Sequence, residues 1–163
     1  MVLSPFPRSK LQRPRVVADF VARDDLQRRL EDATSVPLTL VAAPLGYGKT
    51  SLVAHWLANR VGLAAWLSLD AGDGEPYAFI HALVAAVRSA LPDACSGTLA
   101  CFAAQPLPPL AVLAALLGNE LDDLAEPLVL VLDDLHRIDD RETYALLDRL
   151  LLRPPPHLHL VLI

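Results

Sequence analysis

The residues whose types and spacing point most directly to chemistry lie in the run Leu38–Thr50, where an apolar stretch leads into a glycine loop, a lysine and a hydroxyl residue. Gly46 and Gly48 allow the backbone to curl, so that successive N–H groups as far as Ser51 point inward at one anion. A helix that begins there adds the positive end of its dipole to the same place. The run therefore predicts a phosphate-binding loop.

The side chains of this loop predict how a nucleotide and its metal are held. Lys49 is expected to span the β- and γ-phosphates, the Thr50 hydroxyl to hold Mg²⁺, and Tyr47 and Ser51 to complete the binding loop. The pattern G-x-x-x-x-G-K-[ST] is matched except at Ala43, which takes the place of the first glycine. Lys49 is one of only two lysines in the chain, so a compact charge suited to phosphate lies inside the loop.

A second motif, further along the chain, supplies the carboxylates that the loop lacks. The apolar run 128–132 is followed by Asp133 and Asp134. In a parallel sheet, strand ends open onto one crevice, so Asp133 is expected to bind the Mg²⁺ held by Thr50, which leaves Asp134 to orient or deprotonate the attacking water. Acidic residues also end strands for solubility, but the position downstream of a phosphate loop favours metal binding. His136, just beyond, is either a γ-phosphate sensor or an exposed loop histidine.

The elements that must position these residues alternate along the chain. This alternation predicts an α/β fold, a P-loop NTPase with a mostly parallel sheet flanked by helices. The predicted strands are 38–42, 64–68, 128–132 and 158–163, and the predicted helices are 24–32, one directly after the loop, one from Pro76, 110–124 and one that opens near Asp139. We divide the chain into an arm with a short helix, 1–35, and an NTPase core, 36–163.

Three finer expectations concern single elements. The run 128–132, all Leu and Val, is typical of a strand buried on both faces. Asp139 with Glu142 three residues later has the spacing of a capping box. His55 lies off the apolar face of the helix after the loop, and we interpret it as a histidine on the solvent side.

Composition narrows the class of protein. The 163 residues are 53% hydrophobic, enough for a sizeable core, and the net charge of −5 argues against a nucleic-acid-binding surface on this segment. The start of the chain has no signal-type apolar run, and the longest apolar stretch, 110–117, is far shorter than the roughly 20 residues that span a bilayer, so we expect a cytoplasmic protein. Cys95 and Cys101 lack partners at metal-binding spacing and receive no function.

Taken together, the motifs resemble the N-terminal ATPase domain of the large LuxR-type transcriptional activators, the MalT-like regulators of the STAND class. The matching runs are Ser9–Pro14, Ala43–Thr50, Trp66–Asp70 with Gly72 and Asp73, and Val131–His136. The resemblance extends from about Ser9 to Ile163, and the family also accepts a residue other than glycine at the position of Ala43. It implies an ATP/ADP switch in which an inducer favours the ATP-bound state, self-association of the full-length protein, and DNA binding only through a distant C-terminal domain.

The resemblance also bears on both ends of the chain. In the family the arm before the loop lies near the adenine, which here points to Arg15–Arg23 with Arg23 as the best candidate, although Val21–Leu26 only loosely matches the family's motif. The family places the last strand between the loop strand and the Asp133 strand, and a later strand on the outer edge. After the strand corresponding to 158–163 it has a Ser-Arg pair whose arginine senses the γ-phosphate. We therefore expect a fragment or a truncated reading frame that lacks its last strand.

Three functions remain open at this point. The first is a signalling ATPase module with weak Mg²⁺-dependent hydrolysis that resets a switch. The second is a small-molecule or nucleotide kinase, which needs an acceptor pocket and an arginine-rich lid that the sequence does not show. The third is a nucleotide-binding scaffold without hydrolysis. The absence of Asn-Lys-x-Asp and Leu-Ser-Gly-Gly-Gln motifs argues against a GTPase and an ABC transporter subunit.

Overall fold

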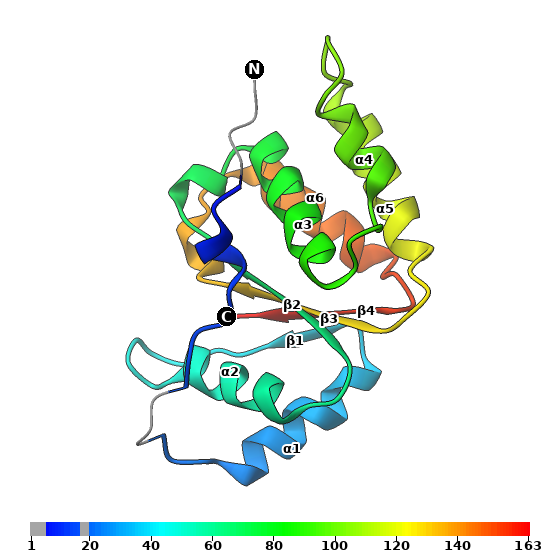
Figure 1. The fold of residues 1–163 in the computed structure, drawn as a ribbon. Helices are drawn as coiled ribbons and strands as arrows, with labels where there is room; N and C mark the ends of the chain where they lie inside the picture. Colours follow the sequence, from blue (N-terminus) through cyan, green and yellow to red (C-terminus); the bar gives the residue numbers. More distant parts are fainter. Residues whose placement is uncertain (1–5, 17–19) are drawn as a thin grey trace.

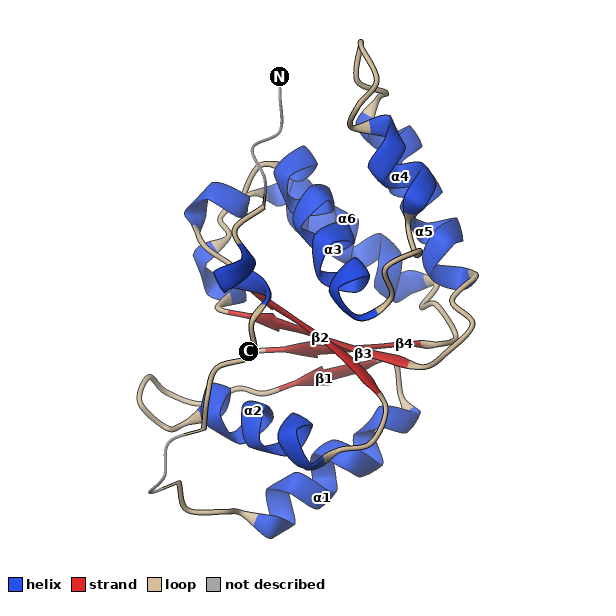
Figure 2. Ribbon diagram, viewed as in Figure 1, coloured by secondary structure: helices blue, strands red, loops and turns tan. Residues whose placement is uncertain are grey.

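A computed structural model describes residues 6–16 and 20–163, and its framework is a four-stranded sheet between two layers of helices (Figures 1 and 2). The strands are β1 (Leu38–Leu40), β2 (Leu63–Ser68), β3 (Leu128–Asp133) and β4 (Leu158–Leu162). The α-helices are α1 (Asp24–Asp32), α2 (Lys49–Asn59), α3 (Pro76–Ala90), α4 (Ser96–Cys101), α5 (Leu110–Asp122) and α6 (Arg141–Leu152). The short 3-10 helices are η1 (Arg8–Leu11), η2 (Ala33–Ser35), η3 (Ala71–Asp73) and η4 (Leu135–Arg137).

The strands are all parallel and follow the order β1-β4-β3-β2. Strand β4, last in the chain, therefore lies between the strand before the phosphate loop and the strand before Asp133, as predicted. Its residue Leu160 is paired with Leu38 on one side and Leu130 on the other. Strand β1 ends at Leu40 rather than at Ala42, because the chain turns into the glycine loop after a single further backbone bond to β4.

Each strand divides its side chains between two cores. All six residues of β3 are buried, which confirms a strand covered on both faces. Its leucines belong to a large cluster with α3, α5 and α6, and its valines Val129 and Val131 belong to a smaller cluster with α2. The period of two along a strand produces this division, and it explains why helices must cover both faces of the sheet.

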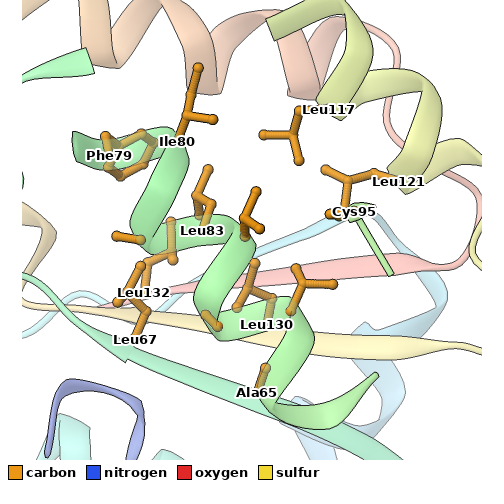
Figure 3. Packing of buried hydrophobic residues seen from close by; sticks show 14 of the residues in the cluster. Ala65, Leu67, Phe79, Ile80, Leu83, Cys95, Leu117, Leu121, Leu130 and Leu132 are labelled. Carbon is orange, nitrogen blue, oxygen red and sulfur yellow. The ribbon is translucent and has the colours of Figure 1, made fainter. Parts of the chain in front are cut away.

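The larger core lies between the sheet and α3, the helix that begins at Pro76 as predicted. Figure 3 shows apolar side chains of α3 facing those of the strands and of α5. The labelled residues are Phe79, Ile80 and Leu83 of α3, Ala65 and Leu67 of β2, Leu130 and Leu132 of β3, Leu117 and Leu121 of α5, and Cys95. Each large apolar side chain that is fully buried contributes roughly 1.5–3 kcal/mol to stability, so this layer dominates the folding energy.

The smaller core attaches α2 to the opposite face of the sheet. Val53 and Trp56 of α2 pack with Val131 and Val161, and the Trp56 indole Nε1 donates to Glu31 of α1 at 2.8 Å. Helix α1 occupies the predicted residues 24–32 and thereby becomes the outer element of this layer. The layer holds the first turn of α2, and with it the glycine loop, at the carboxyl edge of the sheet.

Two of our expectations about single residues are wrong. The cap of α6 is Asp140, whose carboxylate accepts the Thr143 N–H at 2.7 Å, so the helix begins one residue later than an Asp139 capping box requires. His55 is half-buried rather than on the solvent side, because the Phe20 ring stacks on it at 4.7 Å between ring centroids and Gln27 hydrogen-bonds its Nδ1 at 2.6 Å. Contacts from a distant segment decide the environment of this histidine.

A short helix was absent from our predictions altogether. Helix α4 is held by Glu120 of α5, whose carboxylate accepts the N–H groups of Gly97 and Thr98 and the Thr98 hydroxyl. Cys95 precedes it and is buried, and burial raises the pKa of its thiol to about 12, so this cysteine is a packing residue. Within residues 6–16 and 20–163, no helix combines the length and the apolar character needed to cross a membrane.

Candidate functional site

The glycine loop links the end of β1 to the start of α2. Gly46 has φ of 84° and Gly48 has φ of 75°, a left-handed conformation that side-chain-bearing residues disfavour. Gly48 immediately precedes α2, so the turn delivers the chain directly into the first helical turn. The first N–H groups of a helix have no acceptor within the helix, and a loop that leads directly into them is the arrangement that binds phosphate oxygens.

The position of Ala43 accounts for the departure from the glycine pattern. Among the described residues, Cys95 and Asp134 alone have positive φ without being glycine, so the backbone at Ala43 is one that any residue accepts. Its carbonyl takes part in the loop, because it accepts a hydrogen bond from Lys49 Nζ at 2.8 Å. Pro44 O accepts a second bond from the same ammonium at 3.3 Å.

Lys49 lies across its own loop and hydrogen-bonds two of the loop's carbonyls. Its side chain is half-buried, and both of its hydrogen-bond acceptors are neutral carbonyls. In the part of the chain that the structure describes, no carboxylate forms a salt bridge with it. An anion entering the loop therefore meets a cation that forms no salt bridge among the described residues.

The fold brings the phosphate loop and the acidic motif into direct contact. The Thr50 hydroxyl donates to Asp133 Oδ1 at 3.0 Å, across 83 residues of sequence. Asp133 ends β3 and is only 5% exposed. Burial raises the pKa of its carboxyl, while the Thr50 hydrogen bond and the nearby Lys49 charge act in the opposite direction.

This pair has the donor set that suits a hard divalent cation. The backbone N–H of Asp134 also donates to Asp133 Oδ1, at 3.1 Å. Both hydrogen bonds of the carboxylate thus use one oxygen, and within the described segments none reaches Oδ2. A hydroxyl and a free carboxylate oxygen beside a phosphate loop are ligands that Mg²⁺ prefers.

The second carboxylate of the motif lies in a different environment. Asp134 has φ of 60°, and its side chain is 42% exposed. Its carboxylate lies 3.3 Å from Arg137 Nε and 3.9 Å from His136 Nδ1. The His136 side chain is 71% exposed, which places it on the surface of the loop beside Asp134.

The N-terminal arm reaches the phosphate loop from the other side. Arg23 precedes α1 and, with Phe20 and Val21, lines an open pocket of about 380 Å³. The remaining lining residues come from the loop and from the first turn of α2: Gly46, Tyr47, Gly48, Ser51 and Leu52. All predicted binding residues of the loop except Lys49 and Thr50 thus share one pocket with Arg23.

Sequence reasoning missed a cluster of charged residues close to this edge. Lys10 Nζ lies 2.8 Å from Asp70 Oδ2 and 2.7 Å from Asp73 Oδ2. Asp70 and Asp73 both belong to the runs on which the family resemblance rests. Because Lys10 and Asp73 are 63 residues apart, no local spacing rule could have paired them.

Comparison with known proteins adds an independent finding. The family model described as "AAA ATPase domain" matches residues 19–163. The chain is 38% identical to the HTH-type transcriptional regulator MalT of Serratia proteamaculans, 36% to that of Cronobacter sakazakii and 35% to that of Klebsiella pneumoniae, each over 155 residues. The match covers 95% of this chain and 17% of each relative, so the chain spans about a sixth of the length of these regulators.

Proposed function

Since this chain belongs to the AAA ATPase domain family, we propose that it is the nucleotide-binding module of a transcriptional regulator and binds ATP or ADP with Mg²⁺. The contact between Thr50 and Asp133 is the observation that carries the proposal. It joins the end of a glycine loop to a buried carboxylate at the end of β3, which lies one strand away from β1 in the sheet. A solvated acidic strand end would not make this contact.

In this proposal the loop holds the phosphates. The N–H groups from Gly46 to Ser51 surround one phosphate, and Lys49 exchanges its two carbonyl acceptors for the β- and γ-phosphate oxygens. The exchange is favourable because a charge-assisted bond to phosphate is stronger than a bond to a neutral carbonyl. Thr50 and Asp133 Oδ2 hold Mg²⁺, which neutralises charge on the phosphates.

Asp134 is the residue that we assign to the attacking water. Its neighbour Asp133 is committed to the metal, and the backbone at Asp134 is turned into the left-handed region at the strand end. The ion pair with Arg137 holds its carboxylate at the carboxyl edge of the sheet. From there it orients the water or accepts its proton.

We propose the same division into two parts for this function. Residues 36–163 form the core that holds phosphate and metal, and residues 1–35 supply Arg23 on the base side of the pocket. Bound ATP and ADP would differ in the γ-phosphate, at the edge where β3, the loop and the arm meet. A difference at this edge suits a switch. DNA contacts and self-association belong to the regulator as a whole, and the net charge of −5 is in accord with DNA binding elsewhere.

Calorimetry with ATP and ADP, each with and without Mg²⁺, tests this function together with a phosphate-release assay. We expect both nucleotides to bind, Mg²⁺ to strengthen binding, and hydrolysis to be slow. Transfer of phosphate to a small acceptor would identify a kinase, and binding without any phosphate release would identify a scaffold. A failure of both nucleotides to bind would refute the proposal.

The role of Asp134 has its own test. Asp134→Asn keeps the shape of the side chain but removes the carboxylate, so nucleotide affinity should stay the same while hydrolysis falls about 10²–10⁴-fold. Asp139→Asn removes a nearby exposed carboxylate and serves as the matched control. Equal hydrolysis rates in Asp134→Asn and the parent would eliminate the assignment.

A further inference from the structure

The N-terminal arm crosses the carboxyl edge of the sheet from one helical layer to the other. Phe6 and Leu11 pack against the large core on the α3 side, whereas Val16 packs against the small core on the α2 side. Figure 1 shows this dark-blue segment passing beside the C-terminus, next to the end of β4. The arm therefore passes along the edge at which the phosphate loop and Asp133 meet.

A preformed pair of carboxylates holds the arm at one end. The Asp70 N–H donates to Asp73 Oδ2 at 2.8 Å, and the Gly72 N–H donates to Asp70 Oδ1 at 2.8 Å, so η3 fixes both acids by a reciprocal capping box. Asp73 is 4% exposed, and the Lys10 side chain is 18% exposed. Lys10 thus contributes the counter-charge that a nearly buried carboxylate requires.

The carboxylates are in turn fixed to the metal side of the candidate site. The Leu69 N–H, immediately before Asp70, donates to the backbone carbonyl of Asp133 at 2.9 Å. On the other side of η3, the Thr143 hydroxyl donates to Gly74 O at 2.8 Å, which ties the turn to α6. The anchor of Lys10 is therefore a rigid part of the sheet edge.

The other end of the arm forms the wall of the pocket opposite the loop. Phe20 stacks on His55 of α2, and Phe20, Val21 and Arg23 line the pocket with the loop glycines. Phe20 follows Lys10 by ten positions in the sequence, and residues 17–19 of that stretch lie outside the described residues. Phe20 contacts α2 through His55, and Val16, on the Lys10 side of the undescribed residues, packs against the small core.

We propose that Lys10 is a positioning residue for the nucleotide, which locks the arm across the sheet edge so that Phe20 and Arg23 are already in place on the base side. The inference rests on the proposed function. Preorganisation of a binding wall lowers the ordering cost of association, so the lock strengthens binding without touching the ligand. Because the wall faces the nucleoside rather than the phosphates, the effect is confined to ligands that carry a base.

The test compares ATP with inorganic tripolyphosphate by calorimetry, in the presence of Mg²⁺. Lys10→Met leaves the nearly buried Asp73 without a counter-charge and endangers folding. The main variant is therefore Lys10→Met/Asp73→Asn, which removes both charges and keeps the acceptor for the Asp70 N–H. We expect its Kd for ATP and ADP to rise by about 5–150-fold, the usual range of coupling between separate sites. The Kd for tripolyphosphate should change less than about twofold.

Two further variants and one comparison separate the possible outcomes. Arg8→Met removes an exposed positive charge from the same short helix and should leave every Kd unchanged. Lys10→Arg keeps the positive charge beside Asp73, so it should retain most of the ATP affinity that the double variant loses. An equal loss for ATP and tripolyphosphate, or an unchanged ATP Kd in the double variant, would overturn the role of Lys10. Failure of the parent protein to bind either ligand would instead refute the nucleotide site itself.

Discussion

The two lysines of this chain lie at the same edge of the sheet and have opposite electrostatic environments. Lys49 is half-buried, contacts two neutral carbonyls of its own loop and forms no salt bridge among the described residues. Lys10 is also half-buried, but it lies between the carboxylates of Asp73 and of Asp70, the cap of η3. The charge of one lysine is available to a ligand, and the charge of the other is already neutralised.

This difference separates a binding cation from a structural one. Removing a charge that has only carbonyl partners costs the folded protein little, because those carbonyls can turn to water. Removing the partner of a buried carboxylate leaves that carboxylate uncompensated, which is expensive in a poorly solvated place. Substitution of Lys49 should therefore weaken ligand binding with little effect on stability, whereas substitution of Lys10 alone should lower stability as well as nucleotide affinity.

The largest effect is expected for Lys10→Met measured as unfolding in urea. The variant should lose about 3 kcal/mol of unfolding free energy, because Asp73 remains nearly buried without its counter-charge. Adding Asp73→Asn should recover most of that loss. A loss of unfolding free energy below about 1 kcal/mol in Lys10→Met would mean that the Lys10–Asp73 pair stabilises the fold no more than an exposed salt bridge does.

The converse effect is expected for Lys49→Ala measured as thermal stability with and without nucleotide. In the parent, Mg²⁺-ATP at a hundred times its Kd should add about 2.7 kcal/mol, and the variant should lose most of that gain. Its stability without nucleotide should be close to that of the parent, because Lys49 hydrogen-bonds only to neutral carbonyls and forms no salt bridge among the described residues. An undiminished nucleotide shift would contradict the assignment of the phosphate loop.

A smaller effect is expected for Asp133→Asn. Burial raises the pKa of this carboxyl, so its ionised form at neutral pH opposes folding, and a neutral amide should leave the melting temperature unchanged or raise it. The same substitution should remove the Mg²⁺ dependence of nucleotide binding. A clear drop in melting temperature would show that the carboxylate charge supports the fold rather than the metal.

The smallest effect concerns pH. Hydrogen bonding to Lys10 lowers the pKa of Asp70 from its ordinary 3.8, so this part of the stability is present above pH 3.8 and is lost as pH falls through the lowered value. Burial alone would lower the pKa of Lys10, but its bonds to Asp70 and Asp73 outweigh burial and raise it above 10.5. That contribution is present below pH 10.5 and is lost as pH rises through the raised value.

Unfolding of the parent and of Lys10→Met/Asp73→Asn should be measured across pH to check this window. The stability difference between them should be level from about pH 4 to pH 10 and shrink outside that range. A difference that varies within the window would mean that another titrating group faces the cluster. Arg8→Met should show no such pH profile.

The sequence by itself determined the features that depend on neighbouring residues. Gly46 and Gly48 adopt left-handed backbone conformations that other residues disfavour, so the loop could be predicted from its glycines. The strand 128–132 could be predicted because alternate residues of a fully apolar run must be covered on both faces. The meeting of Thr50 with Asp133 followed from the rule that parallel strands end at one edge.

Tertiary structure alone decided contacts that no local pattern encodes. Lys10 and Asp73 meet across 63 residues because the arm folds back over the sheet edge, and His55 is covered because Phe20 lies on it. The cap of α6 shifted from Asp139 to its neighbour, since both residues are acidic and only the packing of the helix selects one. Local conformation is set by backbone sterics and hydrophobic period, whereas the partner of a charge or a ring depends on which distant segment the folded chain brings to it.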